Sequence, residues 1–98
     1  IQPVIEAFLN GKNKKVSNTK SINNKLYLFE NIIAKINLEA KKIAITTNGW
    51  NTATTRSRLN MLPGVNVRSK KGQLYIKIND DKEWEKWNGY WYILNINN

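Results

Sequence analysis

The chain has 98 residues, 41% of them hydrophobic, and its 16 lysines and arginines outnumber seven acids to give a formal net charge of +9. It contains no cysteine and no histidine, which excludes disulfides, thiolate metal sites, cysteine nucleophiles and every histidine-dependent mechanism. Residues 1–79 hold 14 lysines and arginines against three acids, a net +11 that favours a polyanionic partner such as nucleic acid. The alternative is compositional, because an AT-rich genome favours lysine, asparagine and isoleucine codons.

The N-terminal quarter predicts a short helix followed by a basic connection. Pro3 suits a first helical turn, and Asn10-Gly11 ends the helix. Apolar residues at helical spacing form one face of residues 1–9: Val4, Ile5, Phe8 and Leu9. Residues 12–25 are polar and rich in lysine, so we expect a loop or an edge excursion there, with a short strand near Val16.

The next segment predicts a meander of short strands. Residues 26–36 are apolar and alternating, and Glu30-Asn31 lies between two strand-like runs as a tight turn. A second turn at residues 38–42 precedes another apolar run. The expected strands are 26–30, 32–38 and 42–47.

A helix follows whose start and end are both visible in the sequence. A threonine among residues 52–55 caps it, because a hydroxyl accepts hydrogen bonds from the free N–H groups of a first turn. Leu59 and Leu62 lie three residues apart and face the core, and Pro63-Gly64 ends the helix. Packing rather than propensity must hold a helix of about two to three turns.

Residues 65–78 predict the clearest hairpin of the chain, with Lys70-Lys71-Gly72 as its turn. Alternation places Arg68, Tyr75 and Lys77 on the outer face. The inward positions are apolar: Val65, Val67, Leu74, Ile76 and Ile78.

The C-terminal segment predicts an acidic loop, a last strand and a tail. Residues 79–86 carry Asp80, Asp81, Glu83 and Glu85. Residues 87–94 are aromatic and end the fold as a strand, with Asn88-Gly89 as the turn signal. The asparagine-rich residues 95–98 form a fraying tail.

These elements predict an α+β fold: one mostly antiparallel sheet of five to six short strands, with one short helix at about 52–62 packed on one face and a short N-terminal helix beside it. We expect residues 1–98 to form a single small domain. Within it, residues 1–25 form the N-terminal helix and basic loop, residues 26–94 the core, and residues 95–98 the tail.

The candidate binding site is a basic patch shared by the helix and the hairpin. Guanidinium groups suit bidentate contact with phosphate, and an exposed aromatic ring beside cations can stack a base. The predicted nucleic-acid-binding residues are Arg56, Arg58, Arg68, Lys70, Lys71, Tyr75 and Lys77. In the structural alternative, Arg56 and Arg58 pair with Glu30 or Glu39, and Tyr75 covers a second small core.

The four tryptophans divide into two predicted pairs. We expect Trp50 and Trp91 in the core, because a domain this small needs large side chains there. Trp84 and Trp87 lie in and after the charged loop, and we expect them to be exposed and available to a protein partner. The acidic residues lack the spacing of a calcium loop, and the chain shows no activated nucleophile. We therefore expect no metal, no cofactor and no enzymatic activity.

Several motifs resemble a small uncharacterised domain of tailed-bacteriophage proteins. They are Gly49-Trp50, Thr54-Thr55-Arg56-Ser57-Arg58-Leu59-Asn60, Leu62-Pro63-Gly64-Val65, Lys70-Lys71-Gly72 and Trp87-Asn88-Gly89-Tyr90-Trp91. These match the patterns TTRxRLNxLPGV and W-D/N-G-x-W of that domain over residues 26–94. The chain departs from the pattern in a longer loop at 80–86 and in Gln73-Leu74, where an aromatic pair is expected. The resemblance implies a phage origin and a small α+β fold, and it implies no activity.

The sequence therefore predicts a small non-enzymatic phage accessory protein that binds nucleic acid electrostatically through a basic helix-hairpin patch. The alternative is a protein–protein interaction module, either a virion component or a binder of a host protein, that uses the exposed tryptophans and the acidic loop. No apolar run is long enough to span a bilayer, and we expect no membrane partner. The expected location is the host cytoplasm, with the virion as the alternative.

Overall fold

The chain, in a computed structural model that describes residues 1–79 and 83–96, folds into two helices and nine strands within those residues. The helices are α1 (Gln2–Leu9) and α2 (Ala53–Leu59). The strands are β1 (Lys14–Val16), β2 (Thr19–Ile22), β3 (Lys25–Leu28), β4 (Asn31–Asn37), β5 (Lys42–Ile45), β6 (Val65–Lys70), β7 (Gln73–Ile78), β8 (Glu85–Trp87) and β9 (Tyr92–Asn95). The predicted α+β class is confirmed.

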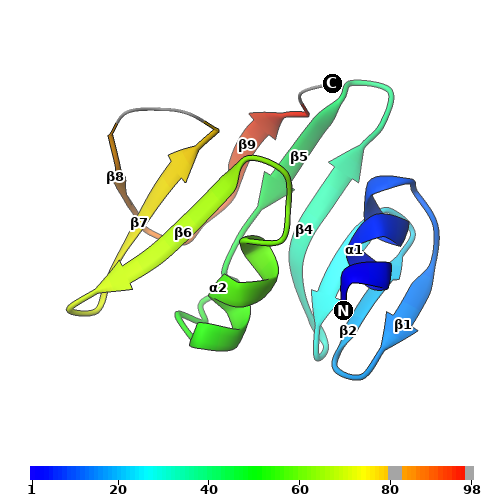
Figure 1. The fold of residues 1–98 in the computed structure, drawn as a ribbon, viewed down its shortest axis with the longest axis horizontal. Coiled ribbons are helices and arrows are strands. Elements are labelled where there is room, and N and C mark those ends of the chain that lie inside the picture. The colour runs from blue at the N-terminus through cyan, green and yellow to red at the C-terminus, as the bar shows by residue number, and fades with distance from the viewer. Residues whose placement is uncertain (80–82, 97–98) are drawn as a thin grey trace.

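The strands form two antiparallel sheets (Figure 1). Sheet A has the order β1-β2-β3-β4-β5-β9, and sheet B has the order β6-β7-β8. The sequence predicts a single sheet, and the difference arises at β9. This strand pairs with β5, where Ile43 lies opposite Leu94, so the segment between them folds as a separate sheet.

The basic segment after α1 forms a hairpin that the sequence predicts only in part. The expected strand near Val16 is β1, and β2 pairs with it across a turn at Ser17-Asn18. Thr19 and Ser21 fill the inward positions of β2 and are fully buried. Small hydroxyl side chains carry no hydrophobic alternation, which is why the pattern predicts a loop.

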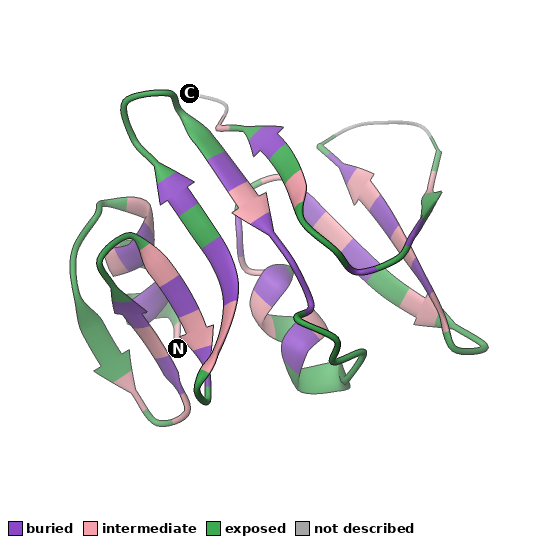
Figure 2. Cartoon of the chain, turned by 180° about the vertical axis from the view of Figure 1, so that it is seen from behind, coloured by how far each residue is buried: buried purple, intermediate pink, exposed green. Residues whose placement is uncertain are grey.

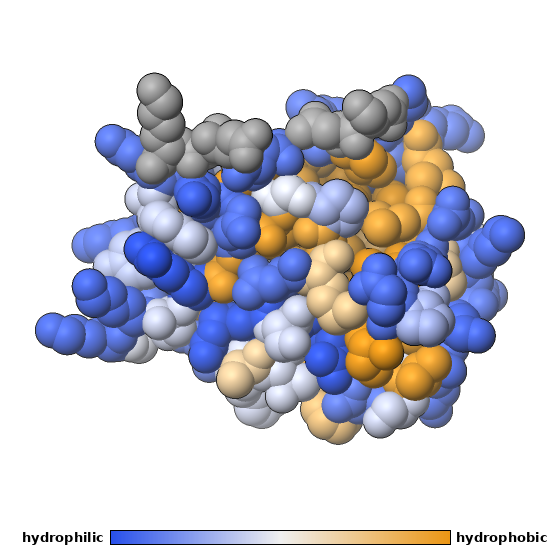
Figure 3. All heavy atoms as spheres, in the orientation of Figure 1, coloured by the Kyte–Doolittle hydropathy of each residue, from blue (hydrophilic) through white to orange (hydrophobic). Residues whose placement is uncertain are grey.

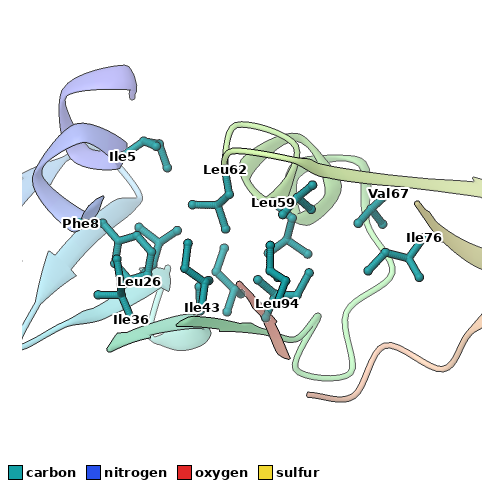
Figure 4. Close-up of a cluster of buried hydrophobic side chains, with 14 of the residues drawn as sticks. Ile5, Phe8, Leu26, Ile36, Ile43, Leu59, Leu62, Val67, Ile76 and Leu94 are labelled. Atoms are coloured by element: carbon teal, nitrogen blue, oxygen red, sulfur yellow. The ribbon is translucent and has the colours of Figure 1, made fainter. Parts of the chain in front are cut away.

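One hydrophobic core joins the two sheets and both helices (Figure 4). Ile5 and Phe8 of α1 cover the inner face of sheet A, and the core continues past Leu59 to Val67 and Ile76 of sheet B. Burial alternates along the strands, and neither of the two helices among the described residues covers the far face of sheet A (Figure 2). Each sheet therefore has one face on the core and one face in solvent.

Helix α2 follows the predicted design. The Thr52 hydroxyl accepts a hydrogen bond from the Thr55 N–H at 3.2 Å, and Leu59 and Leu62 are buried. After the last turn, the Asn60 side-chain oxygen accepts a hydrogen bond from the Val67 N–H at 2.6 Å, and the Asn60 side-chain nitrogen donates one to the Val67 carbonyl at 3.0 Å. Asn60 thereby fixes α2 against β6. Neither helix in the described part of the chain is long and apolar enough to cross a membrane.

Candidate nucleic-acid interface

The outer face of sheet B carries a row of basic and aromatic side chains. The alternating apolar residues of β6 and β7 are buried in the core, so their neighbours point outward. Arg68 lies directly opposite Tyr75, and Tyr75 lies directly opposite Lys86 on β8. Antiparallel pairing therefore places an aromatic ring between two cations on one solvent-facing surface.

Trp84, the residue immediately before β8, extends this surface. The Arg68 guanidinium carbon lies 4.1 Å from the centroid of the Trp84 ring, and the Lys77 ammonium nitrogen lies 5.3 Å from it. Both distances are within the range of cation–π attraction. Because Arg68 and Lys77 point outward from sheet B, the Trp84 ring must lie over that same face.

The charge of this face is positive. Arg68, Lys70 and Lys86 are exposed, and the surface over β6 and β7 is mostly hydrophilic (Figure 3). Glu85 is the one acidic residue of the three strands. Glu85 is exposed, but its register position opposite Ile76 places it on the other side of β8 from Lys86, and its carboxylate accepts a hydrogen bond from the Tyr92 hydroxyl at 2.9 Å.

The β6–β7 turn brings Lys70 and Lys71 to one end of sheet B, and α2 begins beside it. Asn51 joins the two, because its amide donates to the Ser69 hydroxyl at 3.3 Å and to the Gly72 carbonyl at 3.4 Å. The Asn51 side-chain oxygen in turn accepts a hydrogen bond from Arg56. Of the two predicted helix arginines, Arg56 is thus linked to the hairpin turn.

Arg58 points to a different part of the molecule. Its Nε–H donates to the Thr19 hydroxyl at 3.0 Å, and its Nη2 lies 3.4 Å from the Asn18 side-chain oxygen. These bonds tie α2 to the β1–β2 turn, so the structure does not place Arg58 with the hairpin residues. Nor do the arginines pair with Glu30 or Glu39, since the ion pair found among the described residues joins Glu30 to Lys20 at 3.3 Å.

The predicted division of the tryptophans is largely reversed. Trp50 is 56% exposed and Trp91 46% exposed, so the expectation that both lie in the core is wrong. Trp87 is 6% exposed, because it faces inward opposite Leu74 and its ring N–H donates to the Tyr90 carbonyl at 2.9 Å. Trp87 is therefore not available to a partner, whereas Trp84 is half-buried beneath cations.

Comparison with known families settles the origin of the chain. Residues 2–93 match the model of the family described as Kyanoviridae Gp96 protein. The chain belongs to this bacteriophage protein family. The predicted phage origin is confirmed, whereas the specific motifs of the resemblance stay a prediction. No curated protein and no solved structure matches the chain.

For this Gp96-family chain, sequence reasoning missed one member of the interface and misassigned another. Lys86 was part of an acidic loop in the prediction, yet it lies in β8 opposite Tyr75. The signal was the alternation Glu85-Lys86-Trp87, in which an inward Trp87 turns Lys86 outward. Trp84, predicted to bind a protein, lies on the basic face.

The acidic segment presents no metal site in the part of the chain that the structure describes. No group of three or more acidic side chains converges among residues 1–79 and 83–96. Asp80 and Asp81 of the predicted acidic loop lie outside the described residues.

Proposed function

We propose that this phage protein is a non-enzymatic accessory protein that binds single-stranded nucleic acid on the outer face of sheet B. The observation that supports this most is the row Arg68, Tyr75 and Lys86, extended by Trp84 stacked on the Arg68 guanidinium. Open sheet faces that combine aromatic rings with cations suit single strands, because every base has a face to stack and every nucleotide a phosphate to neutralise.

The proposed division of labour follows from side-chain chemistry. Arg68, Lys70 and Lys86 are exposed and contact phosphates, to which guanidinium and ammonium groups bind tightly. Tyr75, whose cross-strand neighbours are Arg68 and Lys86, offers its ring for stacking a base. The Arg68 guanidinium already lies over the Trp84 ring. It offers a second stacking surface to a base, since bases stack on guanidinium groups as well as on aromatic rings.

The test is affinity for single-stranded oligonucleotides measured by fluorescence anisotropy at low salt. Arg68→Gln and Tyr75→Ala should each weaken binding about tenfold, because a stacked or charge-assisted contact contributes about 1–3 kcal/mol. Lys14→Gln, an exposed charge change on β1 at a position opposite inward-facing Ser21, is the matched control and should bind almost as the wild type does. Arg58→Gln should resemble this control, because the Arg58 guanidinium bonds to Thr19 and Asn18 and lies away from sheet B.

The protein-interaction alternative keeps one specific observation in its favour. Phe29 and Trp50, both more than half exposed, line a cleft of about 400 Å³ beside the start of α2. Rings left exposed around a cleft suit a partner's apolar side chain. If wild-type protein fails to bind any oligonucleotide at low salt, this alternative replaces the proposed function. Mass spectrometry of purified virions would then decide between the virion and the host cytoplasm.

A further inference from the structure

Sheet A also has an open face, and its register gathers a second set of aromatic and basic side chains. One cross-strand row runs from Lys20 on β2 through Tyr27 on β3 to Ile32 on β4. The neighbouring row runs from Lys35 on β4 through Ala44 on β5 to Ile93 on β9. The inward neighbours of these residues are buried in the core. This group, here called the sheet A surface, is therefore turned away from both helices (Figure 2).

Lysines lie over the Tyr27 ring of the sheet A surface and over the ring of Trp91, which comes just before β9. The Lys20 ammonium nitrogen lies 5.1 Å from the centroid of Tyr27, and that of Lys35 lies 4.7 Å from the centroid of Trp91. Tyr27 and Ile32, together with Tyr90 and Trp91, line a hollow of about 560 Å³. Tyr90 is 71% exposed, which is a large apolar surface to leave in water.

The charge on the sheet A surface argues for an anionic occupant. Lys25 and Lys35 are direct cross-strand partners, an arrangement that destabilises a sheet through like-charge repulsion. Glu30 also lines the hollow, and its negative charge is paired with Lys20 at 3.3 Å. A polyanion would relieve the repulsion between Lys25 and Lys35, and a neutral apolar partner would aggravate it by excluding water.

We infer that the sheet A surface is a second binding site for single-stranded nucleic acid, with bases stacking in the hollow between Tyr27 and Trp91 and phosphates on Lys25 and Lys35. The inference extends the proposed function, because it assigns the same class of ligand to a separate surface. The protein then engages two segments of strand at once, one on each sheet.

Native mass spectrometry with oligonucleotides of about six nucleotides, near the lower range of known site sizes, tests this directly. Both oligo-dT and oligo-U serve as probes. We expect two oligonucleotides per wild-type protomer. The sheet A variant, Lys35→Gln with Trp91→Ala, should bind one, as should the sheet B variant, Arg68→Gln with Tyr75→Ala. The combination of both variants should bind none.

A matched control and a melting curve keep the result interpretable. Lys14→Gln with Trp50→Ala removes one exposed charge and one exposed ring away from the sheet A surface, because Lys14 lies opposite inward-facing Ser21, and this variant should still bind two. Lys35→Gln alone should weaken the second site without lowering the melting temperature, because it removes the repulsion between Lys25 and Lys35, even if the double variant folds poorly.

The possible failures are distinguishable. One oligonucleotide per protomer, lost only in the sheet B variant, overturns this inference and leaves the proposed function intact. One oligonucleotide per protomer, lost only in the sheet A variant, overturns the proposed function and supports the inference. No binding by wild-type protein overturns both, and loss of one oligonucleotide by the control overturns the assignment to the hollow.

Discussion

Gly72 and Gly89 share a left-handed backbone and differ in their surroundings. Their φ angles are +80° and +85°, so alanine is strained at both positions by about 1–2 kcal/mol. A Cβ on Gly72 would meet nothing within 4 Å, whereas one on Gly89 would lie 2.5 Å from the hydroxyl oxygen of buried Thr47. We therefore expect Gly89→Ala to destabilise the protein clearly more than Gly72→Ala.

Thermal melts of the two glycine variants check this expectation. The Gly89 carbonyl accepts hydrogen bonds from the Thr46 hydroxyl at 2.9 Å and from the Thr47 N–H at 2.8 Å, so a shifted Gly89 also loosens the end of β5. Gly72→Ala serves as the control for the backbone cost alone. Equal melting temperatures for the two variants would show that the packing around Gly89 is unimportant.

The burial of the tryptophans could not be predicted from the pattern of residues. The alternation of residues 65–78 correctly predicted the apolar inward positions of the β6–β7 hairpin and the outward positions of Arg68, Tyr75 and Lys77, because period two is a local property of a strand. The burial of Trp87 depends instead on its pairing with β7, and the exposure of Trp50 on the absence of a covering element. Both depend on contacts distant in sequence, which composition and loop position do not encode.

At the scale of elements, α2 tests whether packing holds a helix too short to be stable alone. Leu59 is fully buried between the two sheets, so Leu59→Ala should lower the free energy of unfolding by about 2–5 kcal/mol. Ser57→Ala, an exposed change on the same helix, should alter it by less than about 0.5 kcal/mol. Urea denaturation measures both variants. An unchanged midpoint for Leu59→Ala would mean that α2 is not docked on the core.

The β1–β2 hairpin shows why an element can escape sequence analysis. Its inward residues are hydroxyls rather than hydrocarbons, and each is satisfied by a distant group. Ser21 donates to the Lys12 carbonyl at 2.8 Å, and Thr19 accepts from Arg58. The same Arg58 was predicted to bind nucleic acid, since a charge pattern does not say which partner a helix residue reaches across the fold. Lys70, Lys71 and Tyr75, which lie on a strongly patterned hairpin, were placed as predicted.

At the scale of the whole molecule, the division into two sheets determines how many surfaces the chain offers. The predicted single sheet would have had one open face. β9 instead takes the place beside β5 at the edge of sheet A, the β6–β7 hairpin lies in a separate sheet, and each sheet has its own solvent-facing side. Strand order depends on such long-range pairing, whereas the strands and turns themselves follow from local patterns.

The sheet B face makes a quantitative prediction about salt. If about five cations, Arg68, Lys70, Lys71, Lys77 and Lys86, each neutralise one phosphate, the log–log salt slope of affinity for single strands on this face should be roughly −3 to −4. The sheet A variant isolates this face for the measurement. Changing both Lys70 and Lys71 to Gln should flatten the slope by about 1 to 1.5, equally for all sequences, because phosphate contacts carry no base information.

Tyr75→Ala should separate stacking from charge in the same titration. Losing a stacked base costs about 1–3 kcal/mol of binding free energy and releases no counterions, so the affinity falls while the slope stays near its wild-type value. Tyr75→Phe is the conservative control, because it keeps the ring between Arg68 and Lys86 and should retain nearly full affinity. A Tyr75→Ala variant that flattens the slope would instead mean that the ring acts by positioning these two cations, and base stacking on Tyr75 would be excluded.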